Sequence, residues 1–558
     1  MRAVTLTLAG SDTKLPERGR VCDPANAEDP MSEPPADPSP PRSALERRTV
    51  SVRNVAASYA GSVVEAAVFL LLTPFLIREL GLAAYGLWGV AVAMAEWLQL
   101  LDLGLREGVV KYVATHQARS AVDGVRRTGD TALFVYCLVA GAASLLGVGL
   151  AWLGLPILVE DPGDLSTARG VLLVLTLSTT FTLPANLSGT ILEGLSRFDL
   201  LNLFRVGHAV LRLFLIVLAL QLEKGLLGVA VCELVARMVL HLARWTALRR
   251  VAPNLVPRPR PHRGEIGRLF GFASWNAVRQ GAEVLLARIY EPLLAAFAGM
   301  GSVGAFLVGR RVASIPTEVI VPMTNVLLPL SSELEAASRE NALRQTLMRS
   351  TKISLLLALP LALAVGMGAE PIQNNWLGGD APEAVPIIQI FSVLFVVVAT
   401  ALPAEVMLLG LGFTRLLALT GLAQTALVIG LGIPMTRGLG AVGLAFAALV
   451  AVVSVNAGIV LPVAVARVGI EPGRLLRGAI GAPLLAAAPV AVVMYYLRDQ
   501  IALGGLAALA AWAGGAGLTY ALLLWWFGFD REERSFLRSH VNRLLLDRSR
   551  ITDWDEPE

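Results

Sequence analysis

Arginines inside apolar stretches are the residues of this chain whose types and spacing point most directly to chemistry. Arg205, His208 and Arg212 are spaced three and four residues apart, which places them on one face of a helix. An ionisable side chain at the centre of a membrane span costs about 2.5 kcal/mol or more, and it usually faces a bundle interior. Guanidinium groups bind phosphate oxygens through paired hydrogen bonds. The spacing therefore predicts an internal site for a phosphate or pyrophosphate group.

A second polar row combines amides with a carboxylate. Asn276, Gln280 and Glu283 are spaced four and three residues apart, and Arg279 precedes Glu283 by four. Glu65 ends a similar row that begins at residue 54. We expect Glu65 and Glu283 to line a shared cavity, where one of them responds to protons or binds a cation. In the alternative interpretation, Glu283 pairs with Arg279 and its role is structural.

Two further arginines, Arg310 and Arg311, lie in a later apolar stretch. Some of these charges have simpler explanations: Arg212 can pair with Glu233, which lies at about the same depth, and Arg205 and Arg310 can extend to the membrane interface. The side chains that we expect to bind substrate are Arg205, His208, Arg212, Arg279, Arg310 and Arg311. Those that we expect to line the cavity or couple transport are Glu65, Glu283, Asn276 and Gln280.

The composition identifies a bilayer as the solvent of this chain. Of its 558 residues, 55% are hydrophobic and 16% are charged, and the mean hydropathy is +0.64. Soluble proteins have about 25% charged residues. None of the four lysines follows a glycine, so no phosphate-binding loop of the Walker type is present and no ATP-driven pump is encoded. No cofactor or metal cluster is predicted. The basic residues sit in short gaps between apolar runs, which argues against a nucleic-acid partner.

The apolar part of the chain predicts an all-α integral membrane protein with fourteen spans. Counting Lys and Arg in the gaps places thirty-one on one side and five on the other, so both termini are expected in the cytoplasm. The gaps on the outer side are too short for a catalytic domain, and we therefore expect no enzyme. The predicted spans are 52–77, 85–105, 131–153, 169–192, 200–220, 225–246, 268–297, 301–329, 352–371, 385–411, 414–433, 438–466, 476–497 and 502–527.

An internal repeat relates the two halves of the chain. Gly81–Gly86 matches Gly299–Gly304 at an offset of 218 residues, and Leu183-Pro184-Ala185 matches Leu402-Pro403-Ala404 at 219. Gly225 matches Gly440 at 215. Six helices fit within such an offset, so we predict two pseudo-symmetric six-helix bundles followed by two C-terminal helices. Transporters often build a central cavity between two repeats of this kind.

Several short motifs resemble one family over residues 52–528. They are Tyr85-Gly86-Leu87-Trp88, Leu101-Asp102-Leu103-Gly104-Leu105, Arg197-Phe198-Asp199-Leu200-Leu201-Asn202 after Gly194, and Leu328-Pro329-Leu330-Ser331. The chain is similar to the polysaccharide-type flippases, the O-antigen type included, of the multidrug/oligosaccharidyl-lipid/polysaccharide transporter superfamily. The resemblance implies translocation of a polyprenyl-pyrophosphate-linked oligosaccharide from the inner to the outer leaflet of a bacterial cytoplasmic membrane. Many relatives carry an aspartate in the seventh helix where this chain reads Ala287-Arg288-Ile289-Tyr290-Glu291, which leaves a coupling role there in doubt.

The predicted organisation has six segments. They are a disordered cytoplasmic tail (1–50), an N-lobe of helices 1–6 (51–247), a basic cytoplasmic loop (248–267), a C-lobe of helices 7–12 (268–467), helices 13–14 (468–528) and an amphipathic cytoplasmic tail (529–558). The expected partners are the lipid-linked glycan and membrane lipids, with transient contacts to a polymerase or to glycosyltransferases.

Three other functions are compatible with parts of this pattern. A cation-coupled multidrug exporter on the same scaffold should have an acidic or aromatic cavity, whereas arginine predominates here. A lipid II flippase shares both the scaffold and the pyrophosphate chemistry. A membrane polysaccharide polymerase or ligase should present a sizeable external loop, which the predicted spans do not contain.

Overall fold

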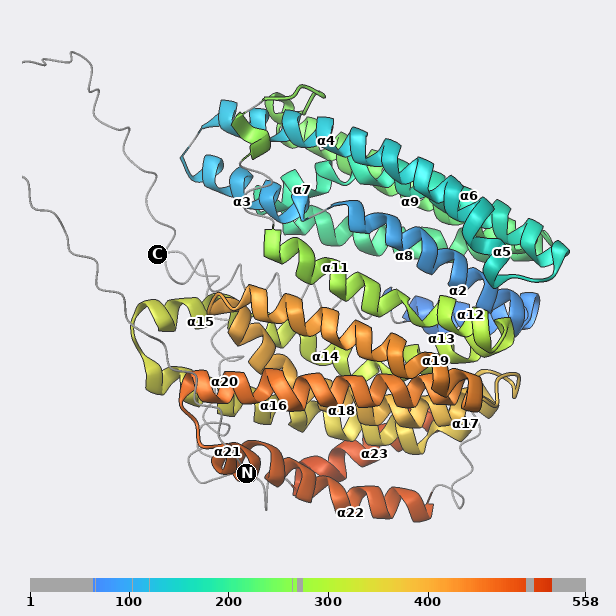
Figure 1. Cartoon of the computed structure of the whole chain (residues 1–558), viewed down its shortest axis with the longest axis vertical. Helices are drawn as coiled ribbons and strands as arrows, with labels where there is room; N and C mark the ends of the chain where they lie inside the picture. Colours follow the sequence, from blue (N-terminus) through green and yellow to red (C-terminus); the bar gives the residue numbers. More distant parts are fainter. Residues whose placement is uncertain are drawn as a thin grey trace, which may run out of the picture. The chain divides into compact units, whose positions relative to one another are not determined.

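All regular elements that the structure describes are helical (Figure 1). The computed structural model describes residues 64–523, except 66, 103, 120, 263, 268–273 and 498–505. The two predicted tails lie outside the described residues, and so does the start, at residue 54, of the polar row that ends at Glu65. The all-α class predicted from the sequence is confirmed for the part of the chain that the structure describes.

The first half of the chain contains a helical segment at residues 64–80 followed by eight α-helices. These are α2 (Leu82–Trp97) with η1 (Leu98–Asp102), α3 (Leu105–Ala118), α4 (Val122–Gly149) with η2 (Leu150–Gly154) and α5 (Leu155–Leu158), α6 (Pro162–Ala185), α7 (Leu187–Gly194), α8 (Phe198–Gln221) and α9 (Gly225–Val251), followed by η3 (Pro253–Leu255).

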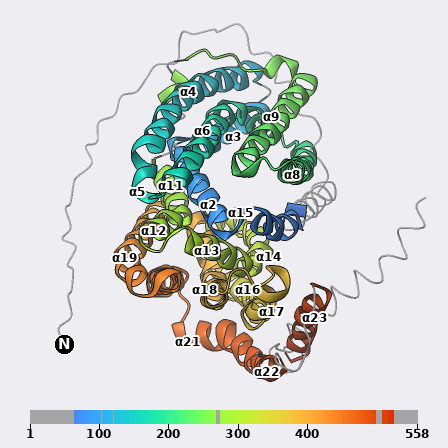
Figure 2. The same cartoon turned by 90° about the vertical axis from the view of Figure 1, so that its right-hand side faces the viewer.

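The second half repeats this course and adds a C-terminal pair. Its helices are α11 (Ser274–Arg288), α12 (Tyr290–Phe297), α13 (Met300–Ala313), α14 (Ile315–Thr324), α15 (Leu327–Ala336), α16 (Glu340–Met367), α17 (Ala369–Trp376), α18 (Ala384–Gly410), α19 (Thr414–Val452), η4 (Val453–Val460) and α20 (Leu461–Val468). The first member of the C-terminal pair is built from α21 (Pro472–Leu475), η5 (Leu476–Gly481) and α22 (Ala482–Leu497), and the second is α23 (Leu506–Leu523). Figures 1 and 2 show α4, α6 and α9 side by side in one bundle and α16, α18 and α19 in another.

The apolar helices make this a multi-pass membrane protein. Among the described residues, nine helices are long and apolar enough to cross a membrane, or ten if the bent pair Met300–Ala313 and Ile315–Ala336 forms one span. One of the nine, Thr414–Val468, has 55 residues, and Gly440 inside it has a non-helical backbone (φ 59°, ψ −141°). Because about 20 residues suffice to cross the hydrocarbon core, this kink divides the segment into two spans. The total of fourteen remains a prediction.

The backbone supports the internal repeat at positions where its φ angle is positive, a conformation that favours glycine. Gly81 and Gly299, 218 residues apart, precede α2 and α13 with φ of 85° and 83°. Gly225 and Gly440 have φ of 60° and 59°. A positive φ is strained for residues with a β-carbon, whereas glycine adopts it freely. The matching glycines therefore mark equivalent turns of the two halves.

The two halves meet where α2 crosses α13. A β-carbon on Gly86 would lie 2.0 Å from the backbone oxygen of Met300, and one on Gly304 would lie 2.3 Å from that of Leu82. Gly86 and Gly304 correspond at the repeat offset, as do Leu82 and Met300. The helices thus approach closely at equivalent residues, and a buried apolar cluster that includes residues of α2, α6, α12, α13, α18 and α19 continues this contact.

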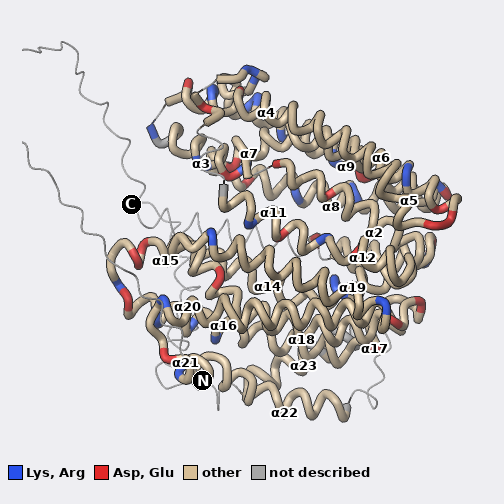
Figure 3. Tube along the Cα trace, in the orientation of Figure 1, with Lys and Arg blue, Asp and Glu red and all other residues tan. Residues whose placement is uncertain are grey.

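Charge is unevenly distributed along the helices. Large apolar side chains on α4 and α5 are exposed, such as Leu145 and Ile157 at 78% and 76%, as expected of a lipid-facing surface. Figure 3 shows long uncharged stretches in α4, α18 and α22, whereas charged residues interrupt the trace around α8 and α11. Of these two charged helices, α11 contacts α2 of the opposite half, and α8 packs against α9 of its own half.

Candidate functional site

Three cavities lie along the boundary between the two halves. The first, which we call the histidine cavity, has a volume of about 350 Å³ and is lined by residues that include His208, His241 and Gln280. The central cavity, about 280 Å³, is lined in part by Glu96 and Arg212. The aromatic cavity, about 290 Å³, is lined by residues of the helical segment 64–80, α2, α11, α13 and α18, among others.

Shared walls connect these cavities in a row. Gln99, Thr179 and Arg237 line both the histidine cavity and the central cavity. Trp88 and Arg288, together with a valine of α2, line both the central cavity and the aromatic cavity. The row runs from the C-terminal end of α2 towards its N-terminal end, which the predicted topology places at the cytoplasmic and outer sides, respectively.

Arginine predominates in the walls of the row. Three carboxylates, Asp102, Glu96 and Glu233, also line it. Guanidinium groups retain their charge in proteins and present planar sets of donors. The walls therefore offer more positive than negative side chains to a ligand. The six lining arginines are Arg106, Arg212, Arg237, Arg288, Arg310 and Arg311.

Glu233 holds two of these arginines at the central cavity. Arg212 on α8 donates through Nε to Glu233 Oε2 at 2.6 Å, and Arg237 donates through Nε to Oε1 at 2.9 Å. The Arg212–Glu233 pair that the sequence offered as an alternative is therefore present. The carboxylate is buried, whereas about a third of each guanidinium side chain is exposed. One carboxylate shared by two arginines leaves this trio with a net positive charge.

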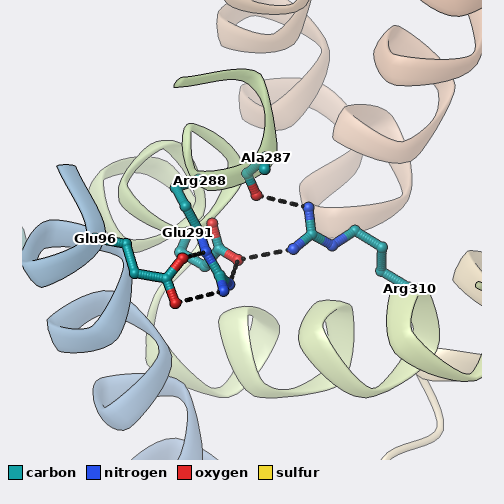
Figure 4. A network of polar contacts seen from close by, with 5 residues as sticks. All are labelled: Glu96, Ala287, Arg288, Glu291 and Arg310. Carbon is teal, nitrogen blue, oxygen red and sulfur yellow. Dashed lines mark hydrogen bonds and ion pairs between the residues drawn. The ribbon is translucent and has the colours of Figure 1, made fainter. Parts of the chain in front are cut away.

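A network of four charged side chains joins the two halves beside the central cavity (Figure 4). Arg288 at the end of α11 contacts both carboxylate oxygens of Glu96 on α2, with Nη2 2.8 Å from Oε1. Glu291 on α12 is fully buried, and its Oε1 lies 3.7 Å from Arg288 Nη1 and 3.3 Å from Arg310 Nη2. Arg310 also donates to the carbonyl oxygen of Ala287 at 2.8 Å. The Glu96–Arg288 pair is thus an ionic contact from one half to the other.

Sequence reasoning did not identify this network. Arg288 and Glu291 were noted only as a departure from the aspartate of relatives, and Glu96 was not considered. The available signal was weak: a glutamate in the second apolar stretch and an Arg/Glu pair three residues apart in the seventh. Of the predicted residues, Arg310 takes part in the network and lies over the ring of Tyr290, with 5.2 Å between its guanidinium carbon and the ring centroid.

Arg205 and Arg311, two of the remaining predicted residues, also form ion pairs. Arg205 Nε lies 3.3 Å from Glu65 Oε1, and Arg311 Nη1 donates to Glu318 at 2.7 Å.

Arg279 pairs with Glu283 on the same helix and donates to Asn276 Oδ1 at 3.2 Å. The local pairing proposed as the alternative for Glu283 is therefore present. Gln280 and His208 line the histidine cavity, whereas Glu65 and Glu283 are not among the residues that line the three cavities. Glu65 and Glu283 thus each have an arginine partner.

The Arg197-Phe198-Asp199 motif anchors the start of α8. Arg197 donates through Nε and Nη2 to the two carboxylate oxygens of Asp199, each at 3.0 Å. These hydrogen bonds raise the pKa of Arg197 above its ordinary value. A carboxylate in the first turn of a helix is also favoured by the helix dipole. The motif therefore has a structural explanation at this position.

Comparison with solved structures identifies the fold. A multidrug resistance MATE family transporter of the MOP superfamily in an inward-facing conformation superimposes with a TM-score of 0.65, at 14% identity over 73% of this chain and 98% of that one. The lipid II flippase MurJ in an inward closed conformation gives 0.59, at 12% identity over 85% and 99%. A MOP superfamily transporter from Pyrococcus furiosus, described as having a binding pocket of reverse polarity, gives 0.54, at 14% identity over 76% and 96%.

Comparison by sequence identifies the family. No curated protein sequence matches the chain. The family model described as "Polysaccharide biosynthesis protein" matches residues 75–386, which is more than half of the chain. The matched region includes the repeat glycines of the first half, the Glu96–Arg288 contact and all six arginines of the cavity walls. The chain therefore belongs to this polysaccharide biosynthesis family, and it has the fold of the MOP-superfamily membrane transporters and flippases.

Proposed function

We propose that this protein flips a polyprenyl-pyrophosphate-linked oligosaccharide from the inner to the outer leaflet of a bacterial cytoplasmic membrane, by alternating access. The observation that carries the proposal is the row of arginine-walled cavities between the halves. A pyrophosphate carries several negative charges, and desolvating it requires fixed positive partners. Guanidinium groups meet this need through paired hydrogen bonds.

The central cavity is the best placed for the pyrophosphate. Arg212 and Arg237 share a single carboxylate, so their attraction for a second anion is only partly satisfied by Glu233. Arg288 borders the same cavity and the aromatic cavity beside it. An anion in the central cavity would contact guanidinium groups from both halves. Because it would contact both, its binding could affect how the halves move relative to each other.

Close packing of helices at the outer end of the row supports an inward-facing state under the predicted topology. The α2–α13 crossing and the aromatic contacts of Tyr290, Phe306 and Phe391, with ring centroids 5.3 to 6.4 Å apart, lie towards the predicted outer side. The match to an inward-facing MATE transporter has a TM-score of 0.65, against 0.57 for an outward-facing one. Transport would require this contact to open, and the Glu96–Arg288 pair to break.

The coupling groups proposed from the sequence are Glu65 and Glu283, one of which would respond to protons or bind a cation. Glu283 lies on the helix that supplies Gln280 to the histidine cavity, and Arg279 is its partner. Glu65, paired with Arg205, is its proposed counterpart. The moving units would be the lobes at residues 51–247 and 268–467, and both termini would remain in the cytoplasm, where contacts with glycosyltransferases or a polymerase could occur.

Lipid II flipping is the second candidate. The MurJ structure covers 85% of this chain and the MATE structures cover 73% to 79%, and all share its fold. An exporter of cationic drugs is disfavoured by arginine-rich walls. Lipid II and a lipid-linked oligosaccharide share the polyprenyl pyrophosphate, and they differ in the group attached to it.

Reconstitution can separate these candidates. The protein in liposomes would be given a fluorescent polyprenyl-pyrophosphate oligosaccharide, lipid II or a cationic dye, and movement across the bilayer would be followed by quenching from outside. We expect transport of the oligosaccharide lipid above that in protein-free liposomes, with little movement of the dye. Transport of the dye alone would contradict the proposal, and faster transport of lipid II would favour the second candidate.

A further inference from the structure

We propose that the histidine cavity is a saccharide subsite, which binds neutral hydroxyl-bearing sugar next to the pyrophosphate. The proposal rests on the proposed function, because it assigns the head group of the same substrate. Its basis is a set of buried polar atoms without protein partners, carried by side chains that line one cavity. These atoms come from three consecutive spans and η1, all in the first half of the chain.

Four side chains that line the histidine cavity carry such atoms. They are Asp102 Oδ1 at the end of η1, Thr182 Oγ1 on α6, His208 Nε2 on α8 and His241 Nδ1 on α9. His241 is 2% exposed, so bulk water does not compensate for its missing hydrogen bond. A buried polar atom without a partner costs about 1–3 kcal/mol. A ligand that supplies hydrogen bonds would recover this cost.

The charge around the cavity disfavours a second phosphate. Arg106, which lines it, pairs with Glu193 at 2.6 Å, so its charge already has a partner. Asp102 contributes a carboxylate to the wall. A carboxylate would repel a phosphate, whereas it accepts hydrogen bonds from hydroxyl groups readily.

A metal ion is not supported as the occupant. No group of three or more His, Cys, Asp or Glu side chains suited to a metal occurs among the described residues. The wall instead mixes imidazole, hydroxyl, amide and carboxylate groups, which can donate to and accept from the several hydroxyls of a sugar. At about 350 Å³ the cavity falls near the lower end of the roughly 300–1,000 Å³ typical of small-ligand sites.

The repeat shows that the carboxylate and one imidazole of this polar wall occur in one half. At the offset of 218 residues, Asp102 corresponds to Ile320 and His208 to Ala426, whereas Thr182 corresponds to Thr400. A wall needed only for folding the bundle would be expected in both halves. The substitution of a carboxylate and an imidazole for apolar residues in one half indicates a task that the other half does not share.

The position of the cavity matches the covalent order of the substrate. Gln99, Thr179 and Arg237 form a wall between the histidine cavity and the central cavity. A pyrophosphate held by Arg212 and Arg237 would therefore have its attached sugar within reach of His241 and Thr182. The predicted topology puts the histidine cavity on the cytoplasmic side, where a lipid-linked glycan is assembled.

Binding of two matched lipids tests the assignment. The probes are undecaprenyl pyrophosphate and the same lipid carrying one N-acetylglucosamine, measured by titration against the full-length protein in nanodiscs. The variants are His241→Phe and Thr182→Val, which remove hydrogen-bonding atoms while keeping similar shapes. Thr176→Val is the matched control, because Thr176 lies on the same helix, also lacks a partner for its hydroxyl, and does not line the cavity.

We expect each of the two variants to weaken binding of the glycosylated lipid by about 5- to 20-fold. Binding of the bare lipid to these two variants should change by less than about twofold. Binding of either lipid to Thr176→Val should also change by less than about twofold. Equal loss for both lipids, or no loss for either, would overturn the saccharide subsite. Arg212→Ala should weaken both lipids, and its failure to do so would count against the proposed function instead. Thermal unfolding of each variant distinguishes lost contacts from lost fold.

Discussion

The contact between Glu96 and Arg288 provides the sharpest test of how the halves separate. These residues join α2 to α11 through both carboxylate oxygens, beside a cavity that the substrate would enter. Replacing Glu96 by glutamine keeps the shape and one acceptor but removes the charge. Arg288 retains Glu291 as a partner, at 3.7 Å, so the variant does not leave an isolated buried cation.

The size of the free-energy change expected for Glu96→Gln follows from how exposed the two side chains of the pair are. Glu96 and Arg288 side chains are 29% and 25% exposed. Exposed ion pairs contribute about 0–1 kcal/mol, whereas removing one partner of a buried pair costs about 3–5 kcal/mol. We take about 1.5 kcal/mol for this intermediate case, which corresponds to roughly a tenfold shift from joined to separated halves.

Double electron–electron resonance measures this shift directly. Spin labels at positions 160 and 380 would report the distance between exposed loops of the two halves at the predicted outer side, after replacement of the native cysteines. Glu96→Gln should increase the population at long distances about tenfold. The matched control is Glu318→Gln, which breaks a pair with Arg311 inside one half. An unchanged distribution in Glu96→Gln, or an equal change in Glu318→Gln, would refute the reasoning.

Three further substitutions test other parts of the account. Gly86→Ala places a β-carbon against a backbone oxygen at the α2–α13 crossing, so we expect a loss of about 1–3 kcal/mol in thermal unfolding, with Gly141→Ala, where space is open, as the neutral control. Arg212→Ala should lower the flipping rate at least tenfold. Arg212→Lys should recover part of that rate, because it restores the positive charge without the planar guanidinium. Arg474→Ala, at an exposed position, is the control and should have no effect. Glu283→Gln should abolish the stimulation of flipping by an imposed ion gradient, and wild-type stimulation in this variant would reject Glu283 as the coupling group.

Features with a local sequence signal could be predicted well. The turns at Gly81 and Gly299 require a positive φ, so the same residue type recurs at the repeat offset. The Arg212–Glu233 pair followed from counting residues along two neighbouring antiparallel helices, because helical rise fixes depth. Span boundaries were less certain because apolar segments continue through breaks such as Gly440.

Contacts between the halves had no such signal. Glu96 and Arg288 are 192 residues apart, and no periodicity within one helix reveals how it crosses a helix of the other half. The histidine cavity forms where several helices converge, α11 of the other half included, and no spacing within one helix places His241 there. Helical spacing identified the faces of individual helices, whereas the identity of the facing residue required the tertiary structure.

The central claim is that the arginine-walled row between the halves binds a lipid-linked pyrophosphate. The most direct measurement is a cryo-electron microscopy structure of the protein in nanodiscs with a polyprenyl-pyrophosphate oligosaccharide. The account predicts pyrophosphate density within hydrogen-bonding distance of Arg212, Arg237 or Arg288. Density for the pyrophosphate only on the lipid-facing surface, with the cavities filled by water, would contradict it.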